Sequence, residues 1–146
     1  MADNNQPSPP DIITMAAGAV MLIAGFLSYW DFGGVSENVF GDFAFPIATF
    51  VWLFGIAAGV HIALVSFANV NLPERVLDFT WAQIHLVLAG FCAIVQVFWL
   101  ITSDTPDKGI GFWLLLLGAI ALVVGAVMRL QQAPSTAGGS TPPTAF

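Results

Sequence analysis

Two histidines inside apolar stretches are the residues whose type and spacing could do chemistry. His61 lies eight residues before Asn69, where a polar segment begins, and His85 lies six residues after Phe79, where that segment ends. On two antiparallel helices these positions fall at similar depth. Imidazoles at matched depth can ligate the iron of a b-type haem, bind a metal ion or exchange a proton.

The simplest expectation is that both imidazoles are neutral and hydrogen-bonded to a nearby carbonyl or hydroxyl group. For haem, Ala57 and Ala89 would leave room beside the ring, whereas Phe54 and Trp81 would crowd it. No Asp or Glu lies within an apolar stretch, which argues against a carboxylate-containing metal site and against a proton pump. We expect no cofactor and no metal, with b-type haem as the alternative.

No other residues have the types and spacing of a catalytic site. Ser28, Ser66 and Ser103 have no neighbouring His and acid, and GxSxG, P-loop and HExxH motifs are absent from the sequence. Cys92 lies among apolar residues, where a thiol behaves as a small hydrophobic group. We therefore expect that the protein is not an enzyme.

The composition indicates which kind of protein must position these residues. The chain has 146 residues, of which 58% are hydrophobic and 8% charged, against about 25% charged in soluble domains. Three Lys and Arg against nine Asp and Glu exclude nucleic-acid binding through a basic patch. A single cysteine excludes a disulfide framework. The sequence therefore predicts an integral membrane protein in contact with the lipid bilayer.

Four uncharged stretches are each long enough to cross a bilayer as a helix, which takes about 20 residues. They span about residues 12–30, 45–68, 79–102 and 110–129. We expect an all-α membrane protein in which these four transmembrane helices form an antiparallel bundle with short loops. The transmembrane domain covers residues 11–130, and Pro-rich polar tails at 1–10 and 131–146 are expected to be disordered.

Several residues near the ends of these helices have the types expected there. Asp11 and Asp78 are predicted N-caps of the first and third helices. Tyr29 and Trp30 are placed in an interfacial aromatic belt. Arg129 is expected to form an exposed ion pair with Asp11 across the same membrane surface, of under about 1 kcal/mol.

Small residues recur on one face of three of the helices, as is typical of helix contacts in membranes. The predicted packing residues are Gly18, Gly25, Gly55, Gly59, Gly118 and Gly125. Gly55 and Gly59 form a GxxxG motif, which could act between chains, although internal packing is the favoured interpretation. In the third helix His85, Cys92 and Gln96 share a polar stripe, which should face the bundle interior.

Few basic residues are present to indicate the orientation. Arg75 and Arg129 lie on one predicted side and Lys108 on the other. The positive-inside rule then places both termini in the cytoplasm and makes the chain a multi-pass protein of the plasma membrane.

Two stretches carry a resemblance to known proteins. They are LPERVLDFTWAQIHLVL at 72–88 and GIGFWLLLLGAIALVVGAVM at 109–128. Together with the Tyr29-Trp30 pair and the Pro-containing tails, they resemble a group of small four-span membrane proteins of actinobacteria. The resemblance covers most of residues 11–130 and implies a topology and a habitat, but no activity.

The leading functional expectation is an accessory or scaffold subunit of a membrane assembly, whose partners are other membrane proteins or the protein itself. The alternative is a haem- or metal-binding redox or transport component that uses His61 and His85. A small channel is a third class, and it would need oligomers because four such helices enclose too little volume for a pore.

Overall fold

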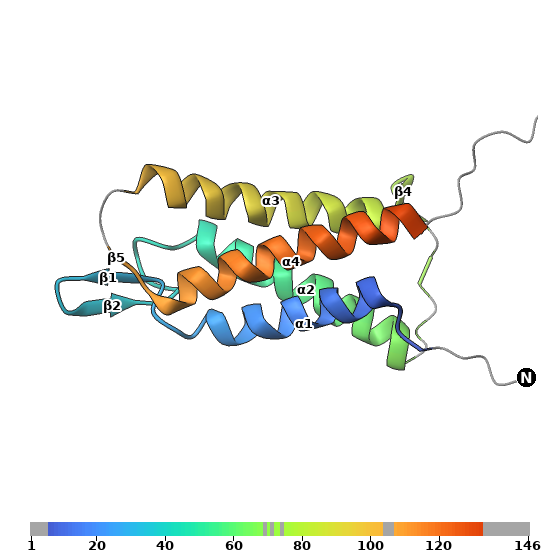
Figure 1. The fold of residues 1–146 in the computed structure, drawn as a ribbon, viewed down its shortest axis with the longest axis horizontal. Coiled ribbons are helices and arrows are strands. Elements are labelled where there is room, and N and C mark those ends of the chain that lie inside the picture. Colours follow the sequence, from blue (N-terminus) through green and yellow to red (C-terminus); the bar gives the residue numbers. More distant parts are fainter. Residues whose placement is uncertain (1–5, 69, 71, 74, 104–106, 133–146) are drawn as a thin grey trace, which may run out of the picture.

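The computed structural model describes residues 6–68, 70, 72–73, 75–103 and 107–132. Within them the chain forms a bundle of four helices that run alternately up and down, as Figure 1 shows. The helices are α1 (Pro9–Ala24), α2 (Ile47–Phe67), α3 (Trp81–Thr102) and α4 (Ile110–Gln132). α1 packs most extensively on α4 and α2, and α3 packs mainly on α4.

Three of the helices are long and apolar enough to cross a membrane. α2, α3 and α4 have 21, 22 and 23 residues, with mean hydropathies of 2.1, 2.3 and 2.6. Their bounds lie within three residues of the predicted spans at 45–68, 79–102 and 110–129. The chain is therefore a helical protein with the character of a membrane-embedded one. α1, with 16 residues, is shorter than the span predicted at 12–30.

The prediction for the first span fails after Ala24 because the backbone leaves the helical pattern there. The N–H groups of Phe26 and Leu27 bond only three residues back, to Ile23 and Ala24, at 3.2 and 3.1 Å. The chain then extends, and the N–H of Tyr29 donates to the carbonyl of Glu37 at 2.6 Å. Sixteen helical residues rise about 24 Å, which is less than the roughly 30 Å of the hydrocarbon core.

The helix caps also differ from the predicted ones. Ser8 caps α1, and Asp11 is the third helical residue, whose Oδ2 accepts the Ser8 N–H at 3.0 Å in a capping box. Thr80 caps α3, and its hydroxyl oxygen accepts the Gln83 N–H at 3.4 Å. Asp78 lies in a turn with φ 66°. Both predicted caps are therefore wrong, by three and two residues. A hydroxyl residue precedes each helix, and Ser8 and Thr80 each pair with the side chain of the third helical residue, Asp11 or Gln83.

Short strands that the sequence analysis did not predict connect the helices. At one end of the bundle β1 (Trp30–Phe32) pairs antiparallel with β2 (Val35–Glu37) and with β5 (Asp107–Lys108). At the other end β3 (Arg75–Val76) pairs with β4 (Phe79–Thr80). The turn between β3 and β4 holds Leu77 and Asp78 at φ 50° and 66°, the positive angles that a two-residue hairpin requires.

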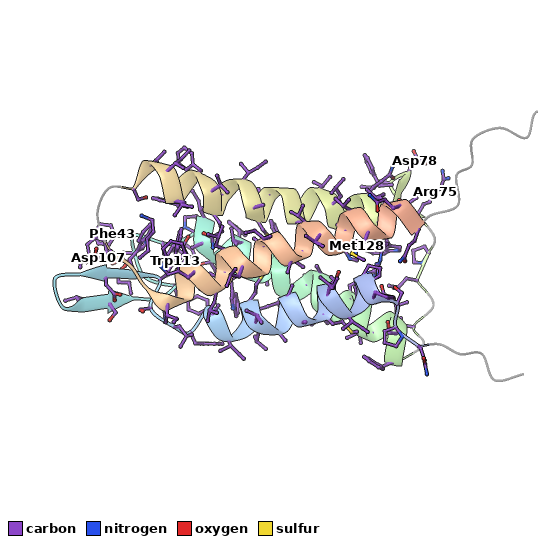
Figure 2. All side chains as sticks on the ribbon, viewed as in Figure 1. Phe43, Arg75, Asp78, Asp107, Trp113 and Met128 are labelled. Carbon is purple, nitrogen blue, oxygen red and sulfur yellow. The ribbon has the colours of Figure 1, made fainter. Side chains whose placement is uncertain are left out.

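The charged residues gather at the two ends of the bundle, and the length between them is mostly apolar. Figure 2 shows Arg75 and Asp78 at the end where α4 finishes near Met128, and Asp107 and Phe43 at the opposite end. This distribution fits helices that cross a hydrocarbon layer between two polar surfaces.

Tyr29 and Trp30 lie in the core, at the end of the bundle that carries the three-stranded sheet. Their side chains are 0% and 1% exposed. The Trp30 ring packs against Trp99 at 5.5 Å and against Phe112 at 5.7 Å between centroids. Both rings therefore pack inside the chain, and their place at a membrane interface stays a prediction.

The six predicted packing glycines all lie against another segment within the chain. A Cβ on Gly18 would stand 2.9 Å from the Cα of Gly59, so the backbones of α1 and α2 touch there. The remaining contacts pair Gly25 with Trp52, Gly55 and Gly118 with Met21, and Gly125 with Thr14. The GxxxG motif of α2 is thus covered by α1 and by the Met21 side chain.

Candidate functional site

His61 and His85 lie side by side at the end of the bundle where α2 finishes and α3 begins. Nδ1 of His61 is 3.0 Å from Nε2 of His85. Helical periodicity explains the contact, since His61 projects from the side of α2 roughly opposite Gly55 and Gly59. α1 occupies the glycine side, and α3 occupies the histidine side. His85 is 5% exposed, and His61 is half-buried.

Arg129 and Asp11 extend this pair into a network that takes one residue from each helix. Arg129 Nη1 is 3.3 Å from Nδ1 of His85, and Nη2 forms a salt bridge with Oδ1 of Asp11. The other oxygen of Asp11 accepts the Ser8 hydroxyl at 2.6 Å, so the capping box of α1 also fixes the carboxylate. The expected Asp11–Arg129 pair is therefore present, but it is mostly buried, with side chains 18% and 23% exposed.

The chemistry of arginine sets the direction of every hydrogen bond in the network. A guanidinium has donors and no acceptor, so Nδ1 of His85 must accept from Arg129. A neutral His85 then carries its proton on Nε2 and donates to Nδ1 of His61. His61 in turn carries its proton on Nε2. Unlike the other ring nitrogens of the pair, this last one is buried with no partner among the described residues.

The unpartnered Nε2–H of His61 is an energetic cost that the fold tolerates. A buried donor left without an acceptor costs about 1–3 kcal/mol. The Trp81 indole stacks on the His61 ring with 4.1 Å between centroids and 27° between planes. The indole N–H donates to the carbonyl of Pro73 at 2.8 Å, which ties Trp81 to the connection between α2 and α3.

A cavity of about 340 Å³ opens beside this cluster. Its polar wall consists of His61, Arg129, Asp11 and Ser66. Its apolar wall includes aliphatic side chains of α2 and of the following connection, namely Ile62, Val65, Val70 and Leu72. The cavity therefore combines one polar end with apolar sides, and Trp81 also borders it.

The histidine pair as arranged does not fit a b-type haem. An ion between two opposed imidazole nitrogens would hold them about 4 Å apart, at about 2.0 Å per bond, whereas these nitrogens are 3.0 Å apart and hydrogen-bonded. Within the described residues no group of three or more His, Cys, Asp and Glu could hold a metal ion. A proton reaching His85 would stop at Arg129, because a guanidinium does not deprotonate in proteins.

The predicted polar stripe on α3 lies in the interior of the bundle. Cys92 and Gln96 are fully buried, as His85 nearly is. The Cys92 thiol lies 3.5 Å from the carbonyl of Val51, and Gln96 Oε1 accepts the Tyr29 hydroxyl at 2.7 Å. Neither of these two residues lines the cavity.

Three features of the site were not predicted from the sequence. They are the contact of Arg129 with His85, the stacking of Trp81 on His61, and the role of Ser8, which lies in the tail expected to be disordered. The sequence did contain a signal for the Arg129–His85 contact. Arg129 continues the face of α4 that carries Gly118 and Gly125, and this face packs inward.

Comparison with protein families, with curated proteins and with solved structures finds no match to the chain. The function is therefore argued from the geometry alone.

Proposed function

We propose that the protein is a non-enzymatic integral membrane protein that acts as an accessory subunit of a membrane assembly. In this proposal it lies in the plasma membrane with both termini in the cytoplasm, and α1 is embedded with the three longer helices. The observation that carries the proposal is an exposed apolar row along the outer face of α3.

The row on α3 has the spacing of a helix-packing seam. Its members recur at alternating intervals of four and three residues and are Val87, Phe91, Ile94, Phe98 and Ile101. Ile94 and Ile101 are each 71% exposed. Only 22% of the apolar window of α3 is buried inside the chain, against 50% for α4. A 3.5-residue repeat is the pattern that holds one helix against another.

The surface of the seam is also hollowed, so that side chains of a partner helix could fit into it. A depression of about 400 Å³ runs along Ala93, Ile94, Val97, Phe98 and Ile101. Apolar surface alone does not drive helices together in lipid, so association depends on side chains that interlock. The regular row beside this depression supports a transmembrane helix of another protein as the occupant.

Site-specific photo-crosslinking in native membranes tests the proposal. A photoreactive amino acid at Ile94, on the seam, is compared with one at Leu117 of α4, which is 60% exposed and off the seam. We expect one discrete protein adduct from position 94 and lipid adducts from position 117. The adduct partner should also co-purify with the tagged chain in fixed ratio in a mild detergent.

Two results would contradict the accessory role. One is an identical set of lipid adducts from both positions. The other is a seam adduct that contains only a second copy of this chain. The absorption spectrum of the purified protein separately tests the haem alternative, which requires a Soret band.

A further inference from the structure

We propose that the cavity beside His61 binds a neutral amphipathic molecule through a carbonyl oxygen, which accepts the Nε2–H of His61. This inference is independent of the accessory role, because the cavity includes no residue of the apolar row on α3 and the binding needs no partner protein.

The hydrogen-bond direction in the network is the first support. Arg129 donates to His85, and His85 donates to His61, so the network ends in a donor at His61 Nε2. That atom is buried without a partner among the described residues. The missing group is therefore an acceptor, which excludes ammonium and guanidinium ligands at this position.

The shape of the cavity is the second support. Its volume of about 340 Å³ is in the range of small-molecule sites, roughly 300–1,000 Å³. Val65 and Leu72 on its apolar wall are 40% and 38% exposed, so the cavity reaches the surface of the bundle. A ligand with one polar atom and an apolar body can enter from the lipid side and place the polar atom at His61.

The charge of the site selects a neutral ligand over an anionic one. Arg129 is paired with Asp11, and the histidine pair is neutral, so the polar wall carries no net charge. A phosphate at this place would meet the Asp11 carboxylate across the cavity. An uncharged carbonyl, as in a quinone ring or an acyl ester, avoids that repulsion and satisfies the donor.

Ligand entry requires a local movement, which gives the site a spectroscopic signature. His61 Nε2 is covered in this structure, and the Trp81 indole lies stacked on the same ring. For an oxygen to reach the nitrogen, the imidazole must turn or the indole must shift. Either movement should change the resonances of His61.

The test uses the full chain, labelled with ¹⁵N-histidine, in dodecyl maltoside, a detergent without a carbonyl group. The probes are a decyl-substituted benzoquinone, monodecanoylglycerol and dodecyl phosphate. We expect a saturable shift of the His61 Nε2 resonance with at least one of the two carbonyl probes, and a weaker effect of dodecyl phosphate. The relative affinities of the two carbonyl probes distinguish a quinone from an acyl ester as the source of the oxygen.

Two substitutions at one position separate the donor from the shape of the side chain. His61→Phe keeps a ring under Trp81 and removes the N–H, so affinity should fall about tenfold or more, as for loss of one hydrogen bond. His61→Gln keeps an N–H donor and should bind more tightly than His61→Phe. Ile94→Ala, on the outer face of α3, is the control and should bind as the parent chain does.

The outcomes that overturn the proposal are distinct. They are no saturable shift with either carbonyl probe, unchanged affinity in His61→Phe, or tighter binding of dodecyl phosphate than of both carbonyl probes. Helical circular dichroism reports whether the variants fold. If His61→Phe does not fold, the parent chain decides, because a shift confined to residues other than His61 also overturns the proposal.

Discussion

The hydroxyl of Tyr29 donates a 2.7 Å hydrogen bond to Oε1 of Gln96, which joins the segment after α1 to the interior of α3. Both side chains are fully buried. The Gln96 amide nitrogen has no partner among the described residues, so the Tyr29 bond satisfies only the carbonyl oxygen of this side chain. The contact spans 67 positions of sequence and fixes where the end of α1 meets the bundle.

Removal of the Tyr29 hydroxyl should destabilise the fold more than its size suggests. Tyr29→Phe leaves Gln96 without its partner, and we expect a loss of about 1–3 kcal/mol in the free energy of unfolding. The double variant Tyr29→Phe with Gln96→Leu should lose less than the sum of the two single changes, because no buried polar group is left unmatched. Unfolding in mixed micelles followed by circular dichroism measures all three, and strict additivity would count against the contact.

The closest approach of α1 and α2 gives a second prediction. Gly18→Ala adds a methyl group 2.9 Å from the Gly59 backbone, so the helices must separate, at a cost of about 1–3 kcal/mol. Gly90→Ala is the matched control, since nothing lies within 4 Å of a Cβ at that position of α3. The same unfolding assay should rank Gly90→Ala as the more stable variant. The reverse order would contradict the close contact.

A third prediction concerns the ion pair between α1 and α4. Asp11→Asn removes one charge of a mostly buried pair and leaves Arg129 uncompensated, so we expect a loss of about 1–3 kcal/mol. A double-mutant cycle with Arg129→Gln should give a coupling energy above about 0.5 kcal/mol. A coupling near zero would mean that the pair behaves like an exposed one.

The tautomers of the histidine pair can be measured directly. We expect both imidazoles to be neutral at pH 7 with the proton on Nε2, because Arg129 donates to Nδ1 of His85. The ¹⁵N shifts of the ring nitrogens report this state. Arg129→Met removes the donor, so His85 should then populate both tautomers while the helical content stays unchanged. A proton on Nδ1 of His85 in the parent chain would exclude the proposed direction.

The parts of the fold that hydropathy controls could be predicted from the sequence. α2, α3 and α4 begin and end within three residues of the predicted spans, since long uncharged stretches must close their own backbone hydrogen bonds in lipid. The similar depth of His61 and His85 followed from the same spans. On two antiparallel helices, residues at similar distances from the shared connection lie at similar depth. The hydrogen bond between them was not predicted, because each imidazole was expected to bond a carbonyl or hydroxyl group.

The parts that depend on contacts between distant segments could not be predicted. The strand that begins at Trp30 pairs with both β2 and β5, and nothing in the apolar pattern of residues 25–29 separates them from a continuing helix. The bond from Arg129 to His85 joins α4 to α3 over 44 positions and was equally hidden from a local analysis.

The three-stranded sheet makes the two ends of the bundle mechanically unequal. β1 bonds to β2 and to β5, so backbone hydrogen bonds join the α1–α2 connection to the α3–α4 connection at one end (Figure 1). At the opposite end the four helices are linked through side chains, along Asp11, Arg129 and the histidine pair. We therefore expect the helices to separate more readily at the histidine end than at the sheet. Amide hydrogen exchange should accordingly be slowest near Trp30 and fastest in the last turn of α2, beside the mouth of the cavity.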